Sequence, residues 1–170
     1  MSAANDIRLM CEAVLHFDEE GLKRFDYVRE ELYDLWTNAF VDTMKTTLQG
    51  IFSEKYSGKI GDIIISTLKK VTVETEEVDT GKVQVSVKGV NIQEAFGDKN
   101  WQLDVDAGVT KDELAEAMLR IIAKKFDALQ PVRTTVFVVD CAYYKEGDLW
   151  GPRDMPKFLS QLFVAANGEQ

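Results

Sequence analysis

Apolar residues recur at two spacings along the chain, and the change from one to the other separates helical from extended segments. A repeat at positions three and four apart predicts a first helix over residues 7–17, with Asn5 or Asp6 able to cap its start. Asp18 then offers a cap for a short second helical turn. The N-terminal part is therefore predicted to be helical.

The strongest helical repeat in the chain runs over residues 26–52 and predicts one long amphipathic helix. Its apolar stripe consists of Val28, Leu32, Leu35, Trp36, Ala39, Phe40, Met44, Leu48, Ile51 and Phe52. Residues 57–61 break the repeat with two glycines and a serine. The isoleucine-rich stretch over 60–68 is compatible with a short helix or a strand, and we favour the helix.

From Val71 the apolar spacing changes to two, which is typical of a strand with one wet face. Three valines of residues 82–88 alternate with lysine, glutamine and serine across a turn at residues 79–82. This pattern predicts an antiparallel hairpin. Gly89 interrupts the alternation and suggests a bulge or a bend.

A second helix and a second hairpin are predicted in the C-terminal half. Thr110 and Glu113 have the spacing of a capping box, and the amphipathic helix that they open ends before Pro131. Residues 132–144 are apolar on both alternating faces, which predicts a central strand covered on both sides. A turn at residues 145–148 leads back into a short strand.

A final short helix completes the predicted order of elements, with Asp154 as its cap. The order is N-terminal helices, a β-hairpin, an amphipathic helix, a second β-hairpin and a short C-terminal helix. We therefore predict an α+β fold in which a curved antiparallel sheet packs on helices in a cone-like form. No linker or repeat divides the chain, so residues 1–170 are expected to form a single domain.

Composition and charge narrow the possible partners. The 170 residues include 29 Asp plus Glu against 20 Lys plus Arg, a formal net charge of −9. An acidic chain without basic patches is a poor ligand for nucleic acids or anionic membranes. No apolar run reaches the ~20 residues that span a bilayer. The N-terminus has no signal-peptide pattern, so the protein is either cytoplasmic, if Met1 is native, or the mature part of an exported precursor.

The residue inventory excludes several kinds of chemistry. His16 is the one histidine, and it is expected to lie at a helix C-terminus rather than in a catalytic triad. Cys11 and Cys141 are expected to be buried thiols, although a bridge between them is conceivable if the fold brings them together. Residues 104–108 fail the calcium-loop pattern at its fifth position, Gly108, and at its twelfth. We therefore predict no metal and no cofactor.

Two sets of residues are candidates for a site. Asp140 lies on the same face of the predicted central strand as two valines, so it is a weak candidate for a catalytic base, although a strand-end aspartate near solvent is the favoured interpretation. Aromatic residues could line a ligand pocket, although such residues at helical and strand spacings also build cores. The pocket candidates are Trp36, Phe40, Trp101, Tyr143 and Trp150.

Three stretches resemble the nuclear-transport-factor-2-like (ketosteroid-isomerase/SnoaL-like) superfamily, in particular its small domains in Gram-positive bacterial lipoproteins. Residues 13–23 are similar to the opening helix of those domains and the step after it. Residues 144–150, with the sequence YKEGDLW, look like their closing hairpin, and residues 158–162 like their terminal helix. The resemblance implies a curved sheet around a cone-shaped cavity, where enzymes of the fold place an Asp base and Tyr or Asp donors.

These observations favour a non-enzymatic ligand-binding or interaction module of a bacterial surface or extracytoplasmic protein, formed from a lipid-anchored precursor. Its expected partner is a small molecule or a protein. The alternatives are an isomerase or cyclase-type enzyme with a pocket carboxylate as its base, and a structural domain that forms a homodimer through its sheet.

Overall fold

The computed structural model of the chain describes residues 2–16, 18–23, 57–91 and 108–167. The helices are α1 (Ala3–Leu15), α2 (Glu19–Lys23), α4 (Ser57–Leu68), α6 (Lys111–Ala128) and α7 (Met155–Ala166). The strands are β1 (Thr72–Asp79), β2 (Lys82–Gly89), β3 (Arg133–Tyr144) and β4 (Leu149–Pro152). The helix predicted over residues 26–52 lies outside the described residues.

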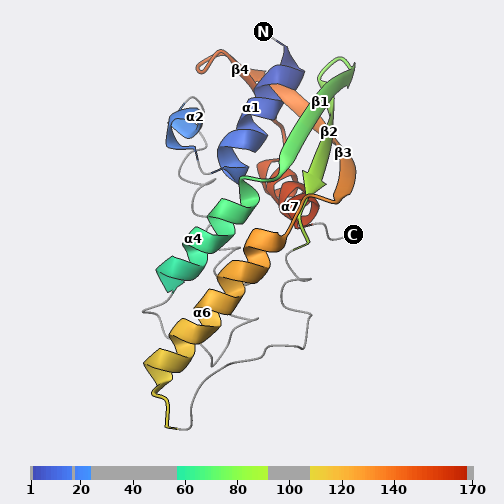
Figure 1. The fold of residues 1–170 in the computed structure, drawn as a ribbon. Helices are drawn as coiled ribbons and strands as arrows, with labels where there is room; N and C mark the ends of the chain where they lie inside the picture. The colour runs from blue at the N-terminus through green and yellow to red at the C-terminus, as the bar shows by residue number, and fades with distance from the viewer. Residues whose placement is uncertain (1, 17, 24–56, 92–107, 168–170) are drawn as a thin grey trace.

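The four strands form one open antiparallel sheet in the order β1-β2-β3-β4. In Figure 1, α1 and α7 lie against the sheet, while α4 and α6 run side by side below it. The predicted α+β class, both hairpins and the short C-terminal helix are confirmed. The order of elements therefore followed directly from the change in apolar spacing.

The core lies between the sheet and the two helices that cover it. Val83, Val85 and Val87 are completely buried on the inner face of β2. Ile7 and Met10 of α1 reach the same core. On α7, Phe158 and Leu162 are buried in the same core, with exposed fractions of 1% and 0%. The alternating valines thus bury one face of the first hairpin, as their spacing predicted.

Helix caps explain where three of the helices begin. Thr110 Oγ1 accepts a hydrogen bond from Glu113 N at 3.2 Å, and Asp154 Oδ1 accepts one from Lys157 N at 3.2 Å, as predicted. The first helix differs from the prediction, because Ser2 is its cap and accepts a bond from Asn5 N. Asn5 and Asp6 lie inside the helix, which leaves Asp6 free for another role.

The α4 helix begins at Ser57, which is the first residue of the predicted break over residues 57–61. It includes residues 57–61, so the two glycines do not prevent it. A Cβ built on Gly61 would have no heavy atom within 4 Å. The helical interpretation of the isoleucine-rich stretch is therefore correct, and the predicted break is wrong.

Gly89 ends β2 without the predicted bulge; the register shift of this hairpin lies between Glu77 and Asp79. A Cβ on Gly89 would lie 2.1 Å from the backbone oxygen of Ala165. Val90 N also donates a hydrogen bond to Ala166 O at 3.0 Å. Glycine is required here because the end of α7 approaches the strand too closely for any side chain.

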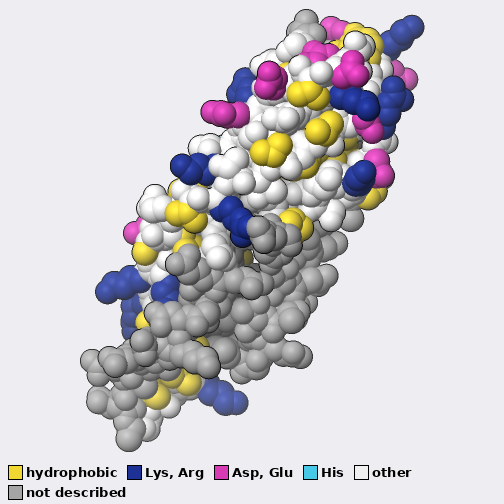
Figure 2. Space-filling model, turned by 90° about the vertical axis from the view of Figure 1, so that its right-hand side faces the viewer, with side chains coloured by type: hydrophobic (Ala, Val, Ile, Leu, Met, Phe, Trp, Pro, Cys, Tyr) yellow, Lys and Arg dark blue, Asp and Glu magenta, His cyan; other side chains and the backbone are white. Residues whose placement is uncertain are grey.

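The outer face of β3 is exposed, which corrects the prediction of a strand covered on both sides. Val136 and Val138 are 54% and 47% exposed. Figure 2 views the molecule from the side on which β3 lies in Figure 1, and apolar side chains there are scattered among charged ones. Apolar residues on both faces of a strand are therefore not sufficient evidence that both faces are buried.

Candidate functional site

Two of the predicted pocket residues meet at the end of the second hairpin. Tyr143 of β3 and Trp150 of β4 are partners in the antiparallel register. Their ring centroids are 5.7 Å apart, and the ring planes are inclined by 59°. Tyr143 is 46% exposed and Trp150 is half-buried. The pair therefore presents aromatic surface to solvent rather than belonging entirely to the core.

A buried carboxylate from the opposite end of the chain is hydrogen-bonded to the backbone of Trp150. Asp6 of α1 is 0% exposed, and its Oδ2 accepts a hydrogen bond from Trp150 N at 3.0 Å. Its Oδ1 is also buried, and no described residue forms a hydrogen bond with it. A buried polar atom without a partner is unfavourable, so native structures rarely retain one without a reason.

A second carboxylate holds the tyrosine hydroxyl. Tyr143 Oη donates a hydrogen bond to Asp148 Oδ1 in the turn that joins β3 to β4. This bond raises the pKa of Tyr143, and desolvation and the negative charges of Asp148 and Asp6 raise it further. Tyr143, Trp150, Asp6 and Asp148 together are called the hairpin cluster below.

The sequence contains a signal for Asp6 that its interpretation as a cap concealed. Asp6, Met10 and Ala13 are spaced as one helical face, and all three are buried. An acidic residue on the apolar face of a helix must find a donor in the core. The missing information was the identity of that donor, because Trp150 is 144 residues away.

Of the other predicted site residues, Asp140 lies on the exposed outer face of β3, opposite Lys82 of β2. It is not in the apolar pocket that a strongly perturbed catalytic carboxyl requires. Trp36, Phe40 and Trp101 lie outside the described residues. The catalytic assignment of Asp140 stays a prediction.

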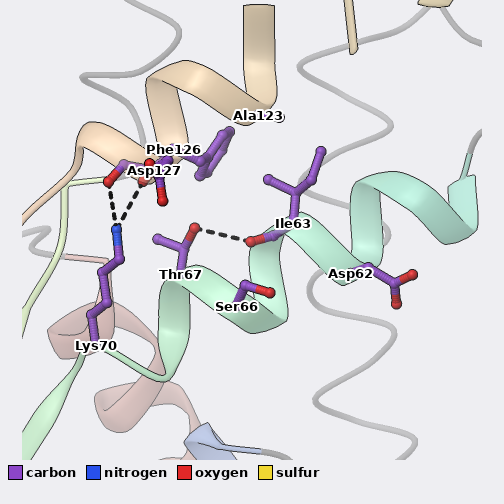
Figure 3. A pocket seen from close by; sticks show the side chains of 8 residues that line it. All are labelled: Asp62, Ile63, Ser66, Thr67, Lys70, Ala123, Phe126 and Asp127. Carbon is purple, nitrogen blue, oxygen red and sulfur yellow. Dashed lines mark hydrogen bonds between the residues drawn. The ribbon is translucent and has the colours of Figure 1, made fainter. Parts of the chain in front are cut away.

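A groove lies between α4 and α6, away from the hairpin cluster (Figure 3). It has two adjoining parts of about 310 and 430 Å³, which share Asp62, Ile63 and Ala123. Lys70 Nζ donates to the backbone oxygens of Asp127 at 2.8 Å and Leu129 at 3.0 Å, near the end of α6. This ammonium therefore satisfies carbonyl groups at a helix C-terminus, which is a structural task.

Another hollow, of about 590 Å³, lies beside α1 and α2. It is lined in part by Glu12, His16 and Asp18. His16 is at the C-terminus of α1, as predicted, and its Nε2 lies 3.1 Å from Val71 O. Glu12 is paired with Arg8. Within the described ranges, no group of three or more His, Cys, Asp or Glu side chains is arranged to hold a metal ion.

The two cysteines are buried free thiols. Burial is the largest cause of the raised pKa of both groups, and it brings the pKa of Cys141 to about 11. Neither thiol is therefore suited to act as a nucleophile near neutral pH.

The comparisons with known proteins define the fold and leave the function open. The structure is similar to the crystal structure of YcdA, a candidate lipoprotein from Bacillus subtilis, with a TM-score of 0.56 and 14% sequence identity. The match covers 96% of this chain and 55% of YcdA, so this chain spans about half the length of that protein. No family model and no curated protein matches the sequence.

The likeness to YcdA agrees with the predicted resemblance to lipoprotein domains at the level of the fold. Among the described helices, none is both long enough and apolar enough to cross a membrane.

Proposed function

We propose that this chain is a non-enzymatic ligand-binding module of a bacterial extracytoplasmic protein, and that the hairpin cluster is its binding site. The observation that carries the proposal is the half-exposed Tyr143–Trp150 pair beside the buried carboxylate of Asp6. The similarity to a candidate lipoprotein supports the proposed location.

The aromatic pair suits recognition because much of its surface is already presented. Tyr143 keeps 46% of its surface exposed although its hydroxyl is hydrogen-bonded to Asp148. That bond holds the ring in place, so little side-chain entropy remains to be lost when a ligand binds. Aromatic side chains with a polar tip are common in binding surfaces for this reason.

The test is an NMR titration of the labelled protein with a library of small cationic, anionic and neutral compounds. We expect shifts at the Tyr143, Asp148 and Trp150 amides that are larger than those at the exposed amides of β1. The Tyr143→Ala variant should lose them, whereas Tyr144→Phe should retain them, because it keeps the neighbouring ring. If no compound shifts the hairpin amides, the proposed site is wrong.

A second candidate function is self-association through the open outer face of the sheet. Val136 and Val138 are half-exposed there, and the register places Gln84 and Ser86 of β2 beside them. The same face has both signs of charge, with lysines on β2 and glutamates on β1, so a second copy can supply complementary charges. These outward-facing residues are Glu74, Glu76, Lys82 and Lys88.

Sedimentation velocity at micromolar concentrations tests this candidate. A dimer that the double substitution Val136→Lys with Val138→Lys converts to a monomer supports it. A monomer in the unsubstituted protein overturns it, and so does a dimer that the double variant leaves intact.

Membership of the nuclear-transport-factor-2-like superfamily, and the isomerase or cyclase activity that it implies, stay predictions. The proposed activity is tested by comparing the turnover of an isomerase or cyclase-type substrate by the unsubstituted protein with turnover by Asp140→Asn. A variant that folds normally and loses turnover supports a catalytic Asp140, whereas full turnover by the variant excludes it as the base.

A further inference from the structure

We propose that the hairpin cluster recognises an organic cation of the quaternary or methylated ammonium class. This inference rests on the proposed function and adds the chemistry of the ligand. Its basis is an inclined aromatic pair in which the Tyr143 hydroxyl is hydrogen-bonded to Asp148 and the Trp150 backbone amide to Asp6, two carboxylates that form no ion pair with any described residue.

The charge of Asp6 favours a cation at the hairpin cluster. Its carboxylate is fully buried and accepts a single hydrogen bond, from the neutral amide of Trp150. Its other oxygen has no hydrogen-bond partner among the described residues. A negative charge in such surroundings is poorly screened, so it favours a positive charge nearby more strongly than a surface carboxylate would.

The negative charge of Asp6 acts on the aromatic pair. It is one of the causes that raise the pKa of Tyr143, together with the bond and charge of Asp148. Both carboxylates therefore favour the neutral phenol. The same two charges favour a cation that contacts the aromatic rings.

The two aromatic rings favour one kind of cation. At 59° the two rings are inclined surfaces rather than a parallel stack. The faces of tyrosine and tryptophan attract cations through their negative quadrupole, and this attraction is largest for cations that lose little hydration on contact. Methylated ammonium groups meet this condition, because their charge is spread over apolar methyl groups.

A metal ion fits the same place less well. Calcium and magnesium require about six oxygen ligands, whereas the hairpin cluster offers two carboxylates. One Asp6 oxygen is occupied by Trp150 N, and one Asp148 oxygen by the Tyr143 hydroxyl. The rings supply no metal ligands, so the cluster favours an organic cation.

The experiment is an NMR titration of the full chain with choline and, separately, with its uncharged carbon isostere 3,3-dimethylbutan-1-ol. The two compounds have the same shape and differ in charge. We expect choline to shift the amides of the hairpin cluster with an affinity about tenfold higher than that of the isostere.

Two variants measure how much each aspartate of the hairpin cluster contributes to choline affinity. Asp6→Asn keeps an oxygen for Trp150 N and removes the charge, so choline affinity should fall about fivefold while the melting temperature confirms folding. Asp148→Asn should lower the affinity similarly. Glu146→Gln is the matched control, since it removes an exposed carboxylate from the same turn without contacting the rings, and it should change the affinity less than twofold.

The outcomes separate the two proposals. Equal binding of the isostere, or unchanged choline affinity in both aspartate variants, overturns the cation and leaves the site. Absence of choline binding, when other compounds of the library shift the hairpin amides, does the same. Absence of any ligand at these amides overturns the proposed function and this inference together.

Discussion

The two hairpins of the sheet have the same antiparallel connection, but different parts of the chain hold them in place. The hairpin of β1 and β2 has two eight-residue strands and a turn at Gly81, and its valines Val73, Val83, Val85 and Val87 are buried. The hairpin of β3 and β4 joins a strand of twelve residues to one of four. Its short strand is held by Asp6, which belongs to the first helix.

This difference teaches where a binding site can form in a small fold. The first hairpin is specified by local alternation and turn chemistry, and its side chains are used in the core. The second is completed from a distance, and its aromatic pair remains partly exposed. Side chains that the core does not require are available for a ligand.

The largest expected effect concerns the close packing of the first hairpin against the end of α7. Gly89→Ala would place a Cβ 2.1 Å from Ala165 O, so the strand or the helix end must move. We expect a loss of roughly 3 kcal/mol in the free energy of unfolding, measured by urea denaturation. Gly61→Ala is the control: a Cβ there meets no atom within 4 Å, and it should raise stability by up to about 1 kcal/mol. A Gly89 variant as stable as the original protein contradicts this packing.

The next effect tests whether the second hairpin depends on the first helix. Asp6→Ala removes the acceptor of Trp150 N, and we expect a loss of about 2 kcal/mol in the free energy of unfolding because that partly buried amide is left without its acceptor. Hydrogen exchange should show the Trp150 amide losing protection while the Val85 amide retains it. Asp6→Asn keeps an acceptor oxygen and should cost less. Equal losses of protection in both hairpins would show that they are not held separately.

A smaller effect tests the local specification of the first hairpin. Gly81 has a φ of +73°, and a Cβ there would lie 3.3 Å from Cys141 O. Gly81→Ala should lower the free energy of unfolding by about 1 to 2 kcal/mol, measured by thermal or urea denaturation. Gly81→Asn should cost less, since asparagine tolerates positive φ. If the two variants are equally stable, conformational strain is not the cause.

The smallest effect concerns the turn of the second hairpin. In Asp148→Asn the carboxylate that accepts the hydrogen bond from the Tyr143 hydroxyl is absent, so the pKa of Tyr143 should fall toward the ordinary value of about 10. NMR titration of the tyrosine ring measures this change, and Glu146→Gln should leave the pKa in place. An unchanged pKa in Asp148→Asn would exclude this bond as the main cause.

The sign of the related pH effect follows from the raised pKa. The folded protein holds the Tyr143 proton more tightly than the unfolded chain does. The stabilising contribution is therefore present below about pH 10 and is lost as the pH rises through the pKa of the folded state. The Asp148→Asn variant should show a weaker decline of stability in that range.

Much of the fold was predictable, because its elements are specified by short-range patterns. Thr110 and Asp154 cap their helices as their spacing predicted, and the alternation around Val85 predicted the buried face of β2. Predictions from local patterns were incomplete or wrong at positions that the local pattern does not fully specify. Ser2 replaced Asp6 as the cap, and Gly89 is explained by the end of α7.

The candidate site was predictable only in part. Tyr143 and Trp150 were candidates from the sequence, and the register of β3 and β4 brings them together. Their pairing follows from the turn between them, which is a local property. Asp6 could not be assigned to them, because no local rule relates a residue of the first helix to a strand near the other end of the chain.

By itself the sequence determined the order of the described helices and strands, the wet face of the first hairpin and the helix caps Thr110 and Asp154, because each depends on residues within a few positions of one another. The tertiary structure decided which face of β3 is covered, why position 89 is glycine and where the Asp6 carboxylate lies. These depend on contacts between distant segments, and the close packing of those segments cannot be read from a local pattern.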